Sequence, residues 1–164
     1  MQNQMNKYRR LKNLFLRQSY LDAWEDYQRS ILKKSFPKWD YIVLTASNEE
    51  QGKAFQKQIE YRSEKGVLPD ATKFLVIPDP DGKRIGSGGA TLHVLRTLSE
   101  REGFLGDFHG KRILVIHSGG DSKRVPQYSV CGKLFSPVPR ELPDGRGSTL
   151  FDRISDRNVR SPVQ

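Results

Sequence analysis

The sequence predicts an α/β protein in which helices cover a parallel β-sheet. Three short apolar runs rich in β-branched residues indicate buried strands: Tyr41 to Ala46, KFLVIPDP (73–80) and RILVIHSGG (112–120). Polar stretches with a helical pattern separate these runs. Strands that alternate with helices form a parallel sheet, and ligand-binding loops then lie at the carboxyl ends of the strands.

The first expected element is an amphipathic helix over residues 7–34, within an N-terminal helical region bounded at 1–38. Pro37 ends this helix. Apolar side chains recur in it mostly at intervals of three, four and seven residues, at Leu11, Leu14, Phe15, Leu21, Trp24 and Ile31. This periodicity predicts that one face of the helix packs against the rest of the protein.

The later elements follow in alternating order. Residues 47–66 predict a helix with Ser47 or Asn48 as N-cap. Another helix is expected from about Leu92 to Arg101, after the glycine-rich segment DGKRIGSGGAT. The run LFSPVP (134–139) is a candidate fourth strand, and LPDGRGS (142–148) is a turn-rich connection.

Composition excludes several classes of protein. The chain has 164 residues, enough for one domain, and 35% of them are hydrophobic. No apolar run approaches the roughly 18 residues that a membrane span needs, and the N-terminus lacks the apolar core of a secretory signal. A single cysteine, Cys131, leaves no internal disulfide. We therefore expect a cytoplasmic protein that does not bind membranes.

Positive charge favours anionic partners of two kinds. The net charge is +9, and residues 1–40 hold nine cations against four anions. A diffuse basic helix of this kind is typical of nucleic-acid binding or of a solvated surface. A second, local cluster of basic residues lies around a glycine pair in the sequence and suggests that the protein binds a phosphate group. Its members are Lys111, Arg112, Lys123, Arg124 and Lys133.

The segment GSGGAT, residues 86–91, is the first of two glycine clusters at predicted strand ends. Gly86, Gly88 and Gly89 would let backbone N–H groups approach an anion, and a following helix would add its positive end. The segment meets neither the dinucleotide fingerprint nor the P-loop pattern. By pattern alone, a plain turn and a phosphate loop fit equally well.

The second cluster, SGGDSKRVPQYSVCGK, follows the third predicted strand. Gly119 and Gly120 offer bare backbone to a nucleotide, and Arg124 could hold phosphate oxygens through two parallel hydrogen bonds. Lys123 points to the same region, and Lys133 returns a further cation at the start of the next strand. The alternative is a solvated basic loop.

Other chemistry-bearing residues have plainer explanations. His117 suits a hydrogen-bonded histidine at a strand end better than a substrate contact. Asp121 and Asp152 suit a loop acid and a helix-start residue better than metal ligands. The histidines and Cys131 show no metal-ligand spacing, so no metal ligand is assigned.

Four motifs in order, WDYIVLTAS, IPDPDGKRIGSGGATL, LVIHSGGDSKRVPQYSVCGKLFSPVP and LFDRI, resemble the L-fucose-1-phosphate guanylyltransferases (GDP-fucose pyrophosphorylases). The likeness is nearest to the form fused to L-fucokinase, and it runs from about Trp39 to Ile154. It implies a three-layer, Rossmann-like nucleotide-diphospho-sugar transferase fold, incomplete here. Residues 39–155 would be the N-terminal portion of that domain, followed by a polar tail over 156–164.

The resemblance also implies roles for individual residues. Gly119 and Gly120 would line the nucleotide, Arg124 would hold the triphosphate with Lys123 beside it, and Lys133 would meet the phosphates near the reacting centre. The GSGGAT glycines, Gly86, Gly88 and Gly89, would lie at the same cleft. Arg124 and Lys133 are thus the expected catalytic residues, and Mg²⁺ is the expected cofactor.

The implied reaction joins GTP and L-fucose 1-phosphate into GDP-L-fucose and pyrophosphate, in fucose salvage. The family's pyrophosphorylase region continues beyond these motifs, so we expect this chain to be part of a longer enzyme that ends in a kinase domain. Two alternatives stay open: a nucleotide-binding fragment without activity, and a basic nucleic-acid-binding module anchored by residues 7–38, which is the less favoured. Neither the base nor the sugar can be derived from the residues themselves.

Overall fold

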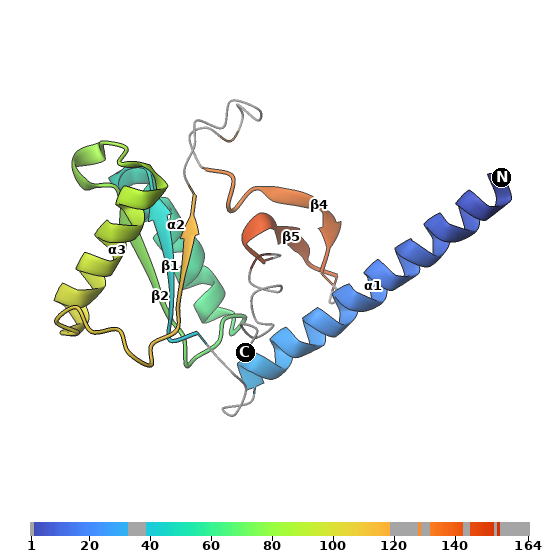
Figure 1. Cartoon of the computed structure of the whole chain (residues 1–164), viewed down its shortest axis with the longest axis horizontal. Helices are drawn as coiled ribbons and strands as arrows, with labels where there is room; N and C mark the ends of the chain where they lie inside the picture. The colour runs from blue at the N-terminus through green and yellow to red at the C-terminus, as the bar shows by residue number, and fades with distance from the viewer. Residues whose placement is uncertain are drawn as a thin grey trace.

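The computed structural model describes residues 2–32, 39–118, 128, 132–142, 145–152 and 154. Its centre is a parallel sheet in the order β2-β1-β3, formed by β1 (Tyr41–Ala46), β2 (Lys73–Pro78) and β3 (Ile113–His117). Helices lie on the two faces of this sheet (Figure 1). The predicted α/β class, its three layers and the three parallel strands are therefore confirmed.

Strand β1 is buried along its whole length because both of its faces are covered. Ile42, Leu44 and Ala46 lie in one core cluster with Phe55 and Ile59 of α2 (Glu49–Glu64). The alternate residues belong to a second cluster with side chains of α3 (Gly86–Glu102), whose buried members are Tyr41, Val43, Ile77, Val94 and Leu98. The continuous apolar run is what a central strand between two helical layers needs.

Helix α2 begins as predicted at an asparagine cap. The side chain of Asn48 accepts a hydrogen bond of 2.8 Å from the backbone N–H of Gln51. Glu49 and Glu50 place negative charge in the first turn, where it stabilises the helix dipole.

Helix α3 begins six residues earlier than predicted. The expected start was about Leu92, but the helix runs from Gly86, so GSGGAT forms its first turns and not a loop before it. The left-handed φ of +73° at Gly86 turns the chain into the helix, and the left-handed Gly103 ends it. Three glycines lower helix propensity, which explains why the pattern placed the start too late.

The C-terminal elements form a separate unit beside α2. Strand β4 (Pro137–Glu141) pairs antiparallel with β5 (Gly147–Thr149), and this pair does not join the parallel sheet. A strand near LFSPVP was expected, but it begins three residues later and belongs to this small sheet. A short 3-10 helix, η1 (Pro80–Gly82), follows β2.

Helix α1 (Gln2–Leu32) contacts the rest of the protein only near its C-terminal end, as far as the described side chains show. Ala23 and Trp24 are buried there, whereas the N-terminal part extends away (Figure 1). The predicted packing of the apolar residues is right for Trp24. It is wrong for Leu11, Phe15 and Leu21, which are 57%, 73% and 45% exposed. The pattern identified the helix correctly, but it could not tell which neighbour covers the apolar face.

No helix in the described part of the chain combines the length and apolar character required to span a bilayer. The proposed boundaries at 38 and 155 fall at residues outside the described ranges.

Candidate functional site

A cavity of 270 Å³ lies at the carboxyl edge of the parallel sheet. It is bounded by the ends of β1 and β3, by Asp79 directly after β2, and by the start of α3. The full lining is Thr45, Ala46, Ser47, Asp79, Arg84, Gly86, Ser87, Ala90 and His117. This is the edge at which parallel α/β sheets bind ligands, because loops from several strands converge there.

The GSGGAT segment forms one wall of this cavity. Gly86 and Ser87 line it, whereas Gly88 and Gly89 are not among the lining residues. Ile85, at the N-cap, makes no side-chain hydrogen bond to the first turn of α3. The first N–H groups of the helix therefore have no side-chain acceptor from their own cap.

Gly89 has a packing role of its own. A Cβ atom at Gly89 would lie 3.0 Å from the Cβ of Ile85, whereas one at Gly88 would meet no atom within 4 Å. Of the three glycines, Gly86 is required by its backbone conformation, Gly89 favours close packing, and Gly88 leaves open space.

His117 links the third strand to both neighbouring elements. Its Nε2 lies 3.1 Å from Oγ1 of Thr91 in α3, and its Nδ1 lies 3.5 Å from Oγ1 of Thr45 in β1. The Thr91 hydroxyl donates to the carbonyl oxygen of Ser87, so Oγ1 of Thr91 accepts from His117 and the ring proton is assigned to Nε2. The expectation of a hydrogen-bonded strand-end histidine is confirmed.

Ser118 bonds to the end of β1 at this edge of the sheet. Its N–H points to Oγ1 of Thr45 at 3.4 Å, and its hydroxyl donates to the carbonyl oxygen of Thr45. The predicted site residues Gly119, Gly120, Lys123 and Arg124, and also Asp121, lie outside the described residues.

The turn that carries Lys133 is held against α2. Gly132, which precedes it, is buried and has a φ of +74°. A Cβ atom there would lie 2.9 Å from Cζ of Phe55 and 3.0 Å from Nε2 of Gln51. The Oε1 of Gln51 accepts a bond of 2.9 Å from the N–H of Ser47, which lines the cavity. Lys133 itself is half-buried and is not among the lining residues.

Replacing Gly132 by alanine is expected to lower the free energy of unfolding by about 2–4 kcal/mol, because left-handed strain adds to a clash with the Phe55 ring. Urea unfolding of the variant measures this loss. Gly66→Ala is the matched control, since Gly66 also has a positive φ, +63°, but no atom within 4 Å of the added Cβ. Equal losses in the two variants would mean that the contact with α2 contributes nothing.

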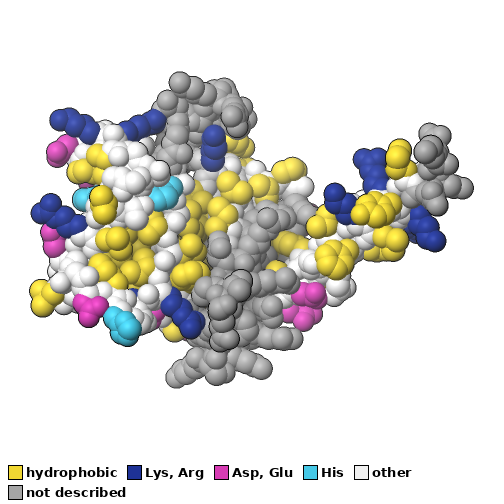
Figure 2. Space-filling model, viewed as in Figure 1, with side chains coloured by type: hydrophobic (Ala, Val, Ile, Leu, Met, Phe, Trp, Pro, Cys, Tyr) yellow, Lys and Arg dark blue, Asp and Glu magenta, His cyan; other side chains and the backbone are white. Residues whose placement is uncertain are grey.

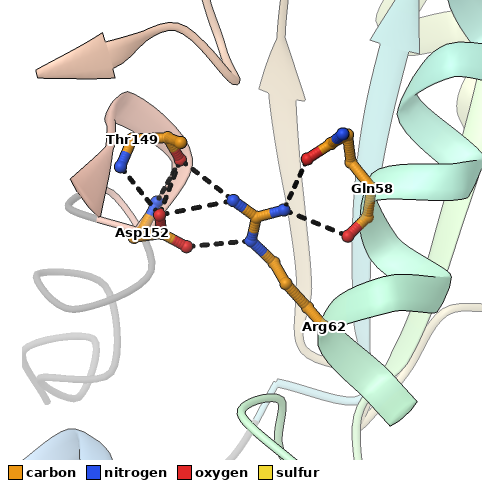
Figure 3. Close-up of polar contacts among 4 residues, drawn as sticks. All are labelled: Gln58, Arg62, Thr149 and Asp152. Atoms are coloured by element: carbon orange, nitrogen blue, oxygen red, sulfur yellow. Dashed lines mark hydrogen bonds and ion pairs between the residues drawn. The ribbon is translucent and has the colours of Figure 1, made fainter. Parts of the chain in front are cut away.

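A largely buried ion pair attaches the C-terminal unit to α2. Nε of Arg62 donates to Oδ1 of Asp152 at 2.9 Å, and the same guanidinium reaches Thr149 and Gln58 (Figure 3). Burial raises the pKa of Asp152, but hydrogen bonds from Arg62 and Thr149 outweigh this effect, so the pKa lies below its ordinary value. These contacts agree with the structural role expected for Asp152, which here joins the C-terminal unit to α2.

The described residues contain no group of three or more potential metal-ligating side chains. Asp79 is the one carboxylate among the residues that line the cavity. A lone carboxylate suits Mg²⁺, which commonly binds through one or two carboxylates together with substrate phosphates and water.

Comparisons with known proteins identify the family that this chain resembles. Residues 106–158 match the model of the fucose pyrophosphorylase domain. The matched segment begins just before β3 and includes the glycine pair, the Lys133 turn and Asp152. The resemblance expected from the four motifs is thereby confirmed.

Curated relatives extend the similarity beyond that segment. A bifunctional fucokinase/GDP-fucose pyrophosphorylase of Arabidopsis thaliana is 41% identical over 139 residues, which cover 72% of this chain and 13% of the relative. A fucose-1-phosphate guanylyltransferase of Mus musculus is 40% identical over 102 residues, 62% of this chain and 17% of the relative. The chain thus spans less than a fifth of these relatives. No solved structure matches it.

Sequence reasoning missed part of the cavity wall. Thr45, Ser47, Asp79 and Arg84 line the cavity but were not selected. Ser47 and Asp79 each follow a strand directly, and this position is the signal that could have found them.

Proposed function

We propose that this chain supplies the nucleotide-binding part of a fucose-1-phosphate guanylyltransferase, which joins GTP and L-fucose 1-phosphate into GDP-L-fucose and pyrophosphate. The observation that carries the proposal is the cavity at the carboxyl edge of the sheet, walled by the start of the GSGGAT helix and by His117. The second motif, SGGDSKR, follows that histidine directly. The names of the relatives supply the substrate class.

In this mechanism the glycines bring backbone N–H groups close to the nucleotide. Gly86 does so at the first turn of α3, and the proposal gives the same role to Gly119 and Gly120. Arg124 holds phosphate oxygens through paired hydrogen bonds, and Lys133 supplies a positive charge near the α-phosphate. Both cations stabilise the charge that moves onto the leaving pyrophosphate.

The bond changes need no proton acceptor. A phosphate oxygen of the sugar phosphate attacks the α-phosphorus of GTP in line, a new P–O bond forms, and the bond between the α-phosphorus and the bridging oxygen breaks. The attacking phosphate monoester is already anionic at neutral pH. The task of the protein is therefore to position two anions and to offset their repulsion.

Mg²⁺, when bound, would neutralise phosphate charge and help to orient the triphosphate. Asp79 is the residue that would hold it here, because it is the one acidic residue among those that line the cavity. GTP, L-fucose 1-phosphate and Mg²⁺ are thus the proposed ligands, and the cytoplasm is the proposed location. A kinase region elsewhere in the full-length protein would parallel the bifunctional relatives.

The proposal predicts pyrophosphate release from GTP and L-fucose 1-phosphate by the full-length protein that contains this sequence. Coupled phosphate detection with inorganic pyrophosphatase measures it. ATP and UTP in place of GTP, and mannose 1-phosphate in place of the fucose ester, are the matched substrate controls. Equal rates with every nucleotide would remove the guanylyl assignment, and no release with any pair would contradict the proposed function.

A further inference from the structure

Helix α1 carries a stripe of exposed side chains. The stripe consists of Lys7, Leu11, Leu14, Gln18, Leu21 and Glu25, and all six are exposed. Ala23 and Trp24, which are buried, do not belong to it. Apolar side chains lie along this helix in Figure 2. A shallow groove on it is lined in part by Tyr8, Leu11, Leu14 and Phe15.

The spacing of the stripe is that of a coiled-coil seam. Successive members lie four, three, four, three and four residues apart, which is the a and d pattern of a heptad. A stripe of this spacing stays on one side of a helix when a second helix packs along it. All six side chains of this stripe are exposed, so a second helix can reach it.

We propose that α1 pairs with α1 of a second copy of this chain as an antiparallel two-helix coiled coil. The stripe is symmetric about residue 16, so an antiparallel partner places Leu11 opposite Leu21 and Leu14 opposite Gln18. Lys7 of one copy then meets Glu25 of the other at each end. Two exposed apolar stripes become one buried seam, which is favourable because apolar surface leaves water.

Charge selects the antiparallel direction. Residues 2–21 of the helix contain five cations, Lys7, Arg9, Arg10, Lys12 and Arg17, and no acid. Asp22, Glu25 and Asp26 follow, and Arg29 is the one cation in the rest of α1. A parallel pair would set five cations against five and Glu25 against Glu25, whereas the antiparallel pair brings the basic part of each helix toward the acidic part of the other.

The expected dimer is weak. The seam covers fewer than three heptads, its central layers contain Gln18, and short helical pairs are marginal in water. We expect a dissociation constant roughly between 1 and 100 µM. Weight-average mass should therefore rise with concentration, and added salt should weaken the dimer because it screens the terminal ion pairs.

Sedimentation equilibrium of the 164-residue chain from 2 to 200 µM tests the proposal, with variants that reverse the terminal charges. Lys7→Glu and Glu25→Lys should each weaken dimerisation about tenfold, because the symmetry turns two attractive contacts into repulsive ones. The double variant, Lys7→Glu with Glu25→Lys, should restore the wild-type dissociation constant. Circular dichroism confirms that all three variants keep their helix content.

Several results would overturn the proposal. A chain that remains monomeric at 200 µM excludes it. Single charge reversals that leave the dissociation constant unchanged also exclude it, because that result is expected of a parallel pair, in which each reversal only replaces one like-charge contact by another. Failure of the double variant to regain dimerisation removes the Lys7–Glu25 contact on which the direction depends. Binding of a single-stranded RNA oligonucleotide by a strictly monomeric chain would assign α1 to nucleic acid instead.

Discussion

Replacing Asp152 by alanine is expected to destabilise the protein by about 3–5 kcal/mol, the loss typical of a buried ion pair that keeps one charged partner. The side chain of Arg62 is only 9% exposed. Its guanidinium carbon lies 4.9 Å from the ring centre of Phe135 and 5.5 Å from that of Phe151. Gln58 would remain as a hydrogen-bond partner, but no carboxylate would balance the charge. Asp152 also accepts from the N–H of Thr149 at 2.8 Å, and this bond would be lost too.

Urea unfolding measures the loss, and two further variants identify its origin. Arg62→Met combined with Asp152→Leu should be less destabilising than Asp152→Ala alone, because neither charge then remains buried. Glu100→Ala is the matched control, since it breaks an exposed pair with Arg96 and should cost at most about 0.5 kcal/mol. A loss below about 1 kcal/mol for Asp152→Ala would mean that the pair does not hold the C-terminal unit in place.

Acid should remove the same contribution in the wild-type protein. The pKa of Asp152 is lower in the folded state than its ordinary value, so the pair stabilises the fold above that ordinary value. Its contribution is lost as the pH falls from about 4 through the folded-state pKa. Stability of Asp152→Ala should therefore fall less steeply over this range than that of the wild type.

The sequence predicted those parts of the fold that depend on local pattern. The three parallel strands are apolar, β-branched runs, and α2 begins at an asparagine, so each carries its own signal. Contacts between distant segments carry no such signal. Arg62 and Asp152 are 90 residues apart, and nothing in either segment indicates that a helix arginine meets a helix-start aspartate.

For the candidate site, too, the sequence predicted what depends on local pattern and missed what depends on contacts between distant segments. The glycine clusters pointed to the carboxyl edge of the parallel sheet, where Gly86 lines the cavity, whereas the roles of Gly119 and Gly120 stay predictions. The pattern could not separate Gly86, which lines the cavity, from Gly88 and Gly89, which do not. Nor could it find Asp79 or Thr45, whose importance comes from neighbours supplied by other elements.

Replacing Arg124 and Lys133 together by alanine is expected to lower kcat/KM for GDP-L-fucose formation by about 10²–10⁴-fold. Each charge-assisted phosphate contact contributes about 1.5–3 kcal/mol, and both contacts act on the same triphosphate. GTP affinity should fall in the same variant, as isothermal titration calorimetry would measure. The Lys133 turn is fixed through Gly132 and through hydrogen bonds from Ser136 to its carbonyl, so the loss of its side chain should leave the fold intact.

A control of equal charge separates this effect from a change in net charge. Lys65→Ala with Arg96→Ala also removes two cations, but Lys65 at the C-cap of α2 and Arg96 on α3 are both exposed and outside the cavity lining. That variant should keep GTP affinity and activity within about twofold, because distant surface charges are screened by salt. Unchanged GTP affinity in the Arg124 and Lys133 variant would exclude the second glycine cluster, SGGDSKRVPQYSVCGK, from nucleotide binding. The cavity beside α3 would then have to bind the triphosphate without it, through Arg84 and the first N–H groups of the helix.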